Sequence, residues 1–188
     1  MTLSPRLAEL EQYLDETRTE LVALIERIPE SALRRPQAEC WSGAEIVDHL
    51  RAVEGSIVKV LNKLLRGAPA RDARIEMPDS GSLMHELDRF GIVEGGRRVE
   101  APEFVRPSRN PDPAQSLAAL AESRKALKAV LQASESVMAD LATYPHHLLG
   151  PLAFYQWVLF VGQHERRHAN QLRQLFEAEA GQGTAHAD

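Results

Sequence analysis

Residues 3–28 read LSPRLAELEQYLDETRTELVALIERI, and their apolar side chains recur in steps of three and four. This spacing places the side chains along one stripe of an α-helix, which packs against partner helices in a folded protein. The stripe consists of Leu3, Leu7, Leu10, Leu14, Leu21, Leu24 and Ile28, with Thr17 in the single gap. Pro29 ends the pattern, because proline interrupts helical hydrogen bonding.

A second helix is predicted from Ser42 onward. Ser42 is followed three residues later by Glu45, which is the spacing of a capping box at a helix N-terminus. The apolar face of this helix consists of Ile46, Leu50, Val53, Ile57, Leu61 and Leu64. Gly67 and Pro69 then end the helix.

Two further helices complete the pattern. Asp112 and Pro113 are a cap followed by a first-turn proline, and they begin the third helix. Its apolar positions are Leu117, Leu120, Leu127, Leu131, Met138 and Leu141, and the next turn is formed by residues 144–147. The fourth helix is expected from about Pro151 to about Ala180, and we find no strand pattern. The chain is therefore expected to be all-α, a four-helix bundle with one long crossover between its second and third helices.

Length and composition restrict the class of protein. The chain has 188 residues, which favours a single domain over residues 1–180, followed by a tail over 181–188 that we expect to be disordered. The 22 basic and 27 acidic side chains give a net charge of −5, which argues against a nucleic-acid partner. We find no signal peptide and no membrane span, so we expect a cytoplasmic protein without a membrane partner.

The single cysteine restricts the chemistry as well. Cys40 alone can form neither an intrachain disulfide nor a multi-cysteine zinc site. It lies nine residues before His49, too far along a helix to be an easy metal ligand. Any metal would therefore depend on histidine and carboxylate side chains.

The segment from Gly67 to Pro113 has little regularity, and prolines and glycines interrupt it throughout. A short helical piece is expected over 82–90. A connection this long is usually functional or disordered. Its arginines (Arg97, Arg98, Arg106 and Arg109) would cover the mouth of a site in the first case and be solvated in the second.

Three histidines lie on the apolar faces of the predicted helices. His49 is beside the face of the second helix, and His164 and His168 are one turn apart on the fourth. Neutral imidazole is a good ligand for zinc, nickel, copper or iron, and three histidines leave coordination positions open for water or substrate. The alternative is that each imidazole is simply buried with another polar partner.

The same helix contains a second motif, because residues 164–168 read HERRH and match the H-E-x-x-H pattern of zinc proteases. Glu165 would be the general base in that interpretation. The context is unfavourable, since arginines fill both variable positions and indicate a solvated face. Only 20 residues follow His168 to supply another ligand.

Two segments resemble signatures of the DinB-like (YfiT-like) superfamily. Residues 41–50, WSGAEIVDHL, resemble its second helix, and residues 147–171, HLLGPLAFYQWVLFVGQHERRHANQ, resemble its fourth. The resemblance implies an up-down-down-up four-helix bundle with a divalent metal, zinc or nickel, held by His49, His164 and His168. Members include transferases and isomerases that use low-molecular-weight thiols, proteins labelled as hydrolases, and many homodimers.

Residues near the histidines have alternative interpretations. Glu45 serves either the capping box or the site, with the cap favoured, and Trp157 is more typical of core than of a substrate platform. Gln163 and Gln171 flank the histidine pair and either orient ligands or face solvent. His146 and His147 precede the fourth helix, and we interpret them as local structure rather than metal ligands.

Three functions remain open at this point. The first is a metal-dependent enzyme acting on a small molecule, a thiol-dependent S-transferase or a hydrolase, in which metal-bound water or a low-molecular-weight thiol attacks an electrophile. The second is a non-catalytic, metal-dependent binder of a small molecule, for example in a stress response. The third is a structural bundle, as a monomer or a homodimer, that buries its histidines without metal.

Overall fold

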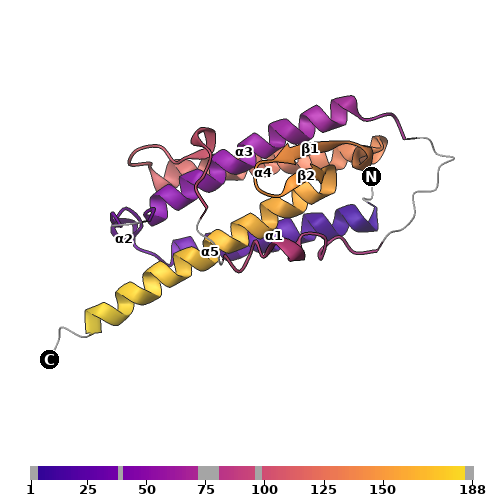
Figure 1. The fold of residues 1–188 in the computed structure, drawn as a ribbon. Helices are drawn as coiled ribbons and strands as arrows, with labels where there is room; N and C mark the ends of the chain where they lie inside the picture. Colours follow the sequence, from indigo (N-terminus) through magenta and orange to yellow (C-terminus); the bar gives the residue numbers. More distant parts are fainter. Residues whose placement is uncertain (1–3, 38–39, 72–80, 96–98, 185–188) are drawn as a thin grey trace.

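The fold is a four-helix bundle, as predicted, with one short hairpin attached (Figure 1). The computed structural model describes residues 4–37, 40–71, 81–95 and 99–184. The bundle helices are α1 (Pro5–Glu26), α3 (Gly43–Gly67), α4 (Pro113–Ala133) and α5 (Phe154–Thr184). Figure 1 shows α3 and α4 running in one direction and α1 and α5 in the other, which is the up-down-down-up order.

The predicted seam of the first helix is the buried face of α1. Leu7, Leu10, Leu14 and Leu21 are almost completely enclosed. Near the end of the helix the seam passes through Ile25, which is 3% exposed. The helix stops at Glu26, because Pro29 has no backbone N–H to continue its hydrogen bonding, and Pro29 is the N-cap of the short helix α2 (Glu30–Leu33).

The predicted capping box begins α3. The Ser42 hydroxyl accepts a hydrogen bond from the Glu45 backbone N–H at 3.3 Å, and the Glu45 carboxylate accepts one from the Ser42 N–H at 2.8 Å. These bonds satisfy two backbone donors that the first helical turn leaves unpaired.

Our expectation that the chain has no strands was wrong. Strand β1 (Thr143–His146) pairs antiparallel with β2 (Gly150–Ala153). Pro145 lies opposite Pro151, and each strand has only four residues, so the period-two signal is too short to detect. Gly150 has a φ of 81°, a left-handed conformation that glycine accepts without steric cost, and it closes the turn.

The hairpin also changes the bounds of the neighbouring helices. Helix α4 ends at Ala133, and residues 134–141 form two single-turn 3₁₀ helices, η3 (Ser134–Ser136) and η4 (Ala139–Leu141), instead of continuing the third helix. Helix α5 begins at Phe154 rather than Pro151, because Pro151 lies in β2. Its backbone continues to Thr184, so residues 181–184 of the expected tail are helical, and 185–188 lie outside the described residues.

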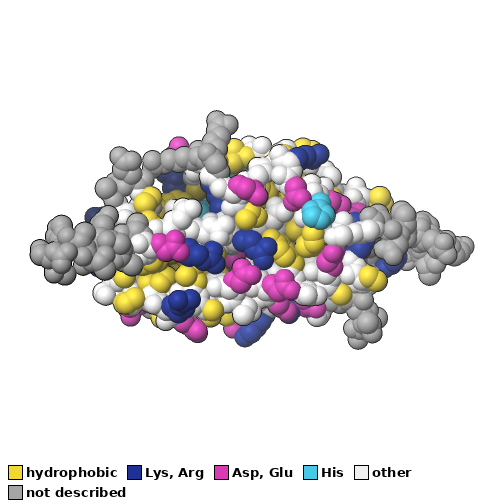
Figure 2. All heavy atoms as spheres, turned by 90° about the horizontal axis from the view of Figure 1, so that it is seen from below, with side chains coloured by type: hydrophobic (Ala, Val, Ile, Leu, Met, Phe, Trp, Pro, Cys, Tyr) yellow, Lys and Arg dark blue, Asp and Glu magenta, His cyan; other side chains and the backbone are white. Residues whose placement is uncertain are grey.

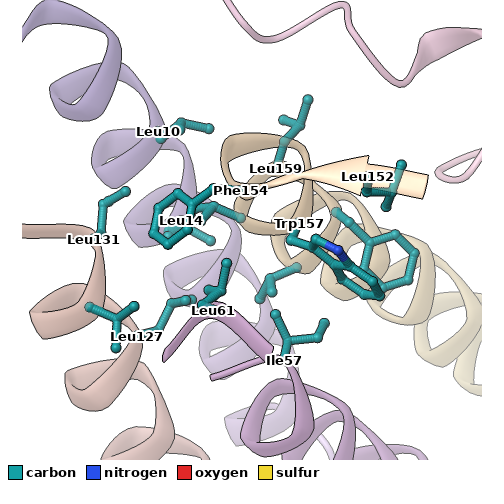
Figure 3. Packing of buried hydrophobic residues seen from close by; sticks show 14 of the residues in the cluster. Leu10, Leu14, Ile57, Leu61, Leu127, Leu131, Leu152, Phe154, Trp157 and Leu159 are labelled. Atoms are coloured by element: carbon teal, nitrogen blue, oxygen red, sulfur yellow. The ribbon is translucent and has the colours of Figure 1, made fainter. Parts of the chain in front are cut away.

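Two apolar clusters fill the bundle. The large cluster, shown in Figure 3, joins residues from all four helices and includes Leu10, Leu14, Ile57, Leu61, Leu127, Leu131, Leu152, Phe154, Trp157 and Leu159. The small cluster lies toward the other end of the bundle and includes Leu21, Ile25, Ile46, Leu50, Leu120, Ala169 and Leu172. Both clusters bury their side chains almost completely, which is the main source of the stability of such a bundle.

A charged layer separates the two clusters, with one residue from each bundle helix: Arg18, Glu54, Arg124 and Glu165. Arg18 contacts Glu54 at 2.6 Å and Glu165 at 2.5 Å, and Arg124 contacts Glu165 at 2.8 Å. The layer has two positive and two negative side chains, and all four are largely removed from water. Buried charges require such pairing, because desolvation penalises each of them separately.

The crossover between α3 and α4 is attached to α3 in its second half, around η2 (Glu103–Val105). The Asp48 carboxylate accepts hydrogen bonds from the Ser108 backbone N–H at 2.7 Å and from the Ser108 hydroxyl at 2.8 Å. The first half contains the 3₁₀ helix η1 (Asp88–Phe90), so only the end of the expected helical piece over 82–90 is helical. Leu83 and Leu87 from this half are buried in the large cluster.

The surface has a mixed character on the face that Figure 2 shows, where acidic, basic and apolar side chains are interspersed. Within the described residues, no helix combines the length and the apolar character needed to cross a bilayer.

Candidate metal centre

The bundle brings the three predicted histidines together. Helix α3 supplies His49, and α5 supplies His164 and His168, which lie one turn apart on the side of α5 that faces α3. One nitrogen from each ring can be chosen so that all three lie within 4.8 Å of one another. The Nε2 atoms of His164 and His168 are 3.2 Å apart.

Hydrogen bonds on the outer side orient two of the rings. His49 Nδ1 lies 2.7 Å from the carbonyl oxygen of Val105, and His168 Nδ1 lies 3.0 Å from the amide oxygen of Gln171. Both oxygens can only accept, so each Nδ1 carries the proton and donates. The Nε2 atoms of His49 and His168 therefore keep a lone pair, the arrangement usual for histidine ligands of metals.

The spacing of the nitrogens suits a divalent metal. Two ligand nitrogens at 2.0–2.1 Å from a tetrahedral ion lie about 3.3 Å apart. The observed 3.2 Å between the Nε2 atoms of His164 and His168 is close to that separation. A set of imidazole nitrogens is preferred by zinc and nickel over calcium or magnesium, which take oxygen ligands.

The electrostatic surroundings keep the imidazoles neutral. Burial lowers the pKa of His49. Burial, followed by the charge of His168, lowers the pKa of His164 well below its usual value. Burial and the charge of His49 bring the pKa of His168 to about 3. At neutral pH all three rings are therefore in the unprotonated form that binds a metal.

Aromatic and loop residues surround the histidine cluster. The Trp41 ring lies 4.6 Å from the His49 ring, and the Phe160 ring stacks on His164 at 5.2 Å. Val105, from η2 of the crossover, is buried beside His49. The crossover therefore contacts the histidine cluster through Val105, which is not one of the arginines that the first interpretation placed there.

The crossover arginines do not act as one group in the described residues. Arg106 pairs with Glu100 and donates to the carbonyl of Ala101 at 3.2 Å. Arg109 is exposed. Arg97 and Arg98 lie outside the described residues.

Glu165 is not placed as a general base, so the protease interpretation fails. Its side chain is 2% exposed, and both carboxylate oxygens accept hydrogen bonds within the charged layer. Thr17, the residue that fills the gap in the first helical stripe, donates one of these bonds at 2.8 Å. Arg166 and Arg167, which the sequence placed on a solvated face, are half-buried, whereas Glu165 points into the bundle.

The flanking residues take separate roles. Glu45 is engaged in the capping box, and Trp157 is buried in the large cluster, where its indole N–H donates to the carbonyl of Tyr144 at 3.2 Å. Gln171 orients His168, whereas the Gln163 side-chain oxygen is enclosed without a hydrogen-bond partner among the described residues. Cys40 is exposed, before the start of α3.

His146 and His147 lie in the hairpin, outside the three-histidine cluster. They stack on each other at 4.6 Å, and the His146 ring also contacts Trp157 and Phe160. The sequence did not single out Val105 or Phe160, since a backbone carbonyl and a helical phenylalanine have no distinctive pattern.

Fold and cluster together define the class of protein: a four-helix bundle that presents three histidines from two helices, a geometry compatible with binding a divalent metal. The sequence profile of the DinB superfamily matches residues 13–172. The chain therefore belongs to the DinB superfamily.

The chain is similar to a protein of known sequence and to a protein of known structure. YuaE, an uncharacterized protein of Bacillus subtilis (strain 168), is 27% identical over 168 residues, which cover 86% of this chain and 91% of YuaE. The crystal structure of TT2238, described as a four-helix bundle protein, matches with a TM-score of 0.58 at 20% identity, over 88% of this chain and 96% of TT2238. The second likeness supports the fold alone.

Proposed function

We propose that His49, His164 and His168 hold a divalent metal, zinc or nickel, and that the protein is a metal-dependent enzyme acting on a small molecule. The observation that carries the proposal is the convergence of three neutral imidazoles, two of them with Nδ1 already bonded on the outer side. Three protein ligands leave coordination positions open, which is typical of catalytic rather than structural sites.

The residues of the chain have defined tasks in this proposal. When bound, a divalent metal would lower the pKa of a coordinated water or thiol and thereby generate a nucleophile near neutral pH. Val105 and Gln171 fix the orientation of His49 and His168. Trp41 and Phe160 provide apolar walls that limit access of bulk water. The reaction classes that fit are transfer of a thiol to an electrophile and hydrolysis.

Metal analysis and turnover test the proposal. We expect purified protein to contain about one zinc or nickel ion per chain, and we expect His49→Ala, His164→Ala or His168→Ala to lower that content. His85→Ala is the matched control, because His85 is exposed in the crossover and contacts the neighbouring Asp88. A screen of low-molecular-weight thiols against electrophiles should then detect turnover in the wild type and in His85→Ala, but not in the three variants of the site. Equal metal content in all variants would refute the proposed site.

A specific observation favours the alternative of a non-catalytic, metal-dependent binder. Among the described residues, the carboxylates nearest in sequence to the histidines, Asp48 and Glu165, accept hydrogen bonds elsewhere, so neither is available as a base. In that case the same variants lose metal and ligand binding, but no thiol or water reaction is detected. A histidine-dependent turnover would exclude the binder-only function.

The proposal extends to the cellular location and the oligomeric state. We propose a cytoplasmic protein with a small-molecule ligand, in line with the single exposed cysteine and the absence of a spanning helix among the described residues. The homodimer stays a prediction, and measurement of the solution mass by light scattering tests it.

A further inference from the structure

His146, at the end of β1, has a fixed tautomer. Its Nδ1 lies 3.2 Å from the backbone N–H groups of both Leu148 and Leu149, which can only donate. A ring nitrogen that accepts carries no proton, so the proton of the neutral ring is on Nε2. Burial, followed by the charge of His147, lowers the pKa of His146 to about 4, so the ring is neutral at pH 7. His146 therefore presents one N–H donor that points out of the hairpin turn.

That donor lies beside the histidine cluster. The His146 ring is 4.8 Å from the Phe160 ring, and Phe160 stacks on His164 at 5.2 Å, so one aromatic side chain contacts both imidazoles. Trp157 contacts His146 from the preceding turn of α5, at 5.2 Å. Hairpin and helix thus hold the His146 ring on the same face of α5 that carries the candidate metal ligands.

The donor also has no acceptor within the described part of the chain. None of the hydrogen bonds of His146 involves Nε2. The enclosed polar atoms without partners, among the described residues, belong to Arg6 and Gln163. Nε2 of His146 is not among these fully enclosed atoms, although the residue as a whole is only 8% exposed.

The charge near the site favours a negatively charged ligand. Arg167 lies on α5 between His164 and His168, directly before His168 in the chain. Gly95 of the crossover packs against the Arg167 guanidinium. A cation and a fixed N–H donor beside a metal position form stronger hydrogen bonds with an anionic oxygen than with a neutral one.

We propose that the Nε2–H of His146 donates a hydrogen bond to a carboxylate of the ligand that binds at the His49, His164 and His168 site. This inference rests on the proposed function, because it requires a metal at the three histidines. It assigns His146 as a ligand-binding residue and narrows the ligand to an anionic molecule with a carboxylate near its metal-binding group.

Two substitutions of His146 test its Nε2–H donor separately from its Nδ1 acceptor, which bonds within the turn. His146→Asn places an amide oxygen where Nδ1 accepts from Leu148 and Leu149, and removes the Nε2 donor. His146→Gln places an amide N–H near Nε2, and removes the acceptor in the turn. His147→Asn is the control, since His147 is the exposed neighbour in the same turn.

The experiment uses the full chain loaded with cobalt(II), whose absorption reports thiolate binding. Each variant is titrated with mercaptoacetate, mercaptopropionate and mercaptobutyrate, and with ethanethiol and propanethiol, which lack the carboxylate. We expect His146→Asn to weaken binding of at least one mercapto acid about tenfold, the effect of a hydrogen bond to a charged group. Binding of the uncharged thiols should stay within about twofold, and His146→Gln should recover most of the loss.

The outcomes distinguish this inference from the proposed function. Unchanged binding of every mercapto acid by His146→Asn, or an equal loss for acids and uncharged thiols, overturns the role of His146 and leaves the metal site in place. Failure of the wild type to bind cobalt at the three histidines overturns both. Thermal melting of each variant shows whether the hairpin is intact.

Discussion

The charged layer makes a strong prediction about stability, tested by Glu165→Gln. Glu165 accepts hydrogen bonds on both carboxylate oxygens: from Arg18 at 2.5 Å on one, and from Thr17 and Arg124, both at 2.8 Å, on the other. Glutamine has a single side-chain oxygen. Its amide nitrogen would therefore face one of the two guanidinium groups, and two positive charges would remain against Glu54 alone.

The magnitude follows from the burial of the pairs. Removing one partner of a buried ion pair costs about 3–5 kcal/mol, because the remaining charge is left uncompensated. The Arg124 side chain is 7% exposed, but that of Arg18 is 14% exposed and keeps some contact with water. We therefore expect a loss near the lower limit, about 3–4 kcal/mol. At about 2–4 °C per kcal/mol for a domain of this size, the melting temperature should fall by about 6–16 °C.

Urea unfolding followed by circular dichroism measures this loss, with Glu20→Gln as the control. Glu20 pairs with Arg166 at 3.3 Å on the surface, so its substitution should cost less than about 1 kcal/mol. The double variant Arg124→Met with Glu165→Leu should be more stable than Glu165→Gln, because it removes one charge of each sign. Metal content should stay at the wild-type level. A loss below 1 kcal/mol in Glu165→Gln would refute the reasoning.

Three further predictions concern acid, packing and metal. Burial alone would raise the pKa of Asp48, but the hydrogen bonds from Arg51 and Ser108 outweigh this effect and lower the pKa to about 2. Because this lies below the unfolded value of about 3.9, we expect about 2–3 kcal/mol of stability to be present above pH 4 and lost as the pH falls toward 2, and acid titration of Asp48→Asn should lack this component. Gly162→Ala should lower the free energy of unfolding by about 1–3 kcal/mol in thermal melts, because the added Cβ would lie 2.5 Å from a ring carbon of Tyr13. The control is Gly55→Ala, whose Cβ would have no neighbour within 4 Å, so this variant should be neutral or stabilised by up to about 1 kcal/mol. Removal of metal with a chelator should lower the melting temperature of the wild type but not of His168→Ala, and equal melting with and without chelator would contradict metal binding.

Helical periodicity predicted the parts of the fold that depend on long repeating patterns. The stripe from Leu7 to Leu21 and the capping box at Ser42 both appear as expected, because each is a local signal. The cluster of His49, His164 and His168 was predictable for the same reason: the positions on each helix follow from its period, and the family resemblance pairs the helices.

The charged layer was not predicted from the sequence, because polar residues in an amphipathic helix usually face solvent. A signal was nevertheless present. Glu54 lies four residues after Leu50 and three before Ile57, so it shares the spacing of the buried stripe with its neighbour Val53. A charged side chain at such a position must find a buried partner, and only the tertiary structure shows that the partners are Arg18 and Arg124.

The hairpin was missed for a different reason. Tyr144 and Pro145 in β1 lie opposite Leu152 and Pro151 in β2, so the pairing depends on contacts across a turn and not on a pattern along either strand. A longer third helix was expected instead, because Met138 and Leu141 extend the apolar spacing of α4. In the structure, Met138 directly precedes η4 and Leu141 ends it, before the chain enters the hairpin.

The hydrogen bond between His49 and the carbonyl of Val105 limits which substitutions the crossover tolerates. A main-chain carbonyl is present whatever the side chain, so most substitutions at position 105 preserve the acceptor itself. What must be maintained is the path of the backbone, which the Ser108 contacts with Asp48 hold three residues further on. Substitutions in the crossover can therefore change the side chains that contact a ligand without changing the orientation of His49.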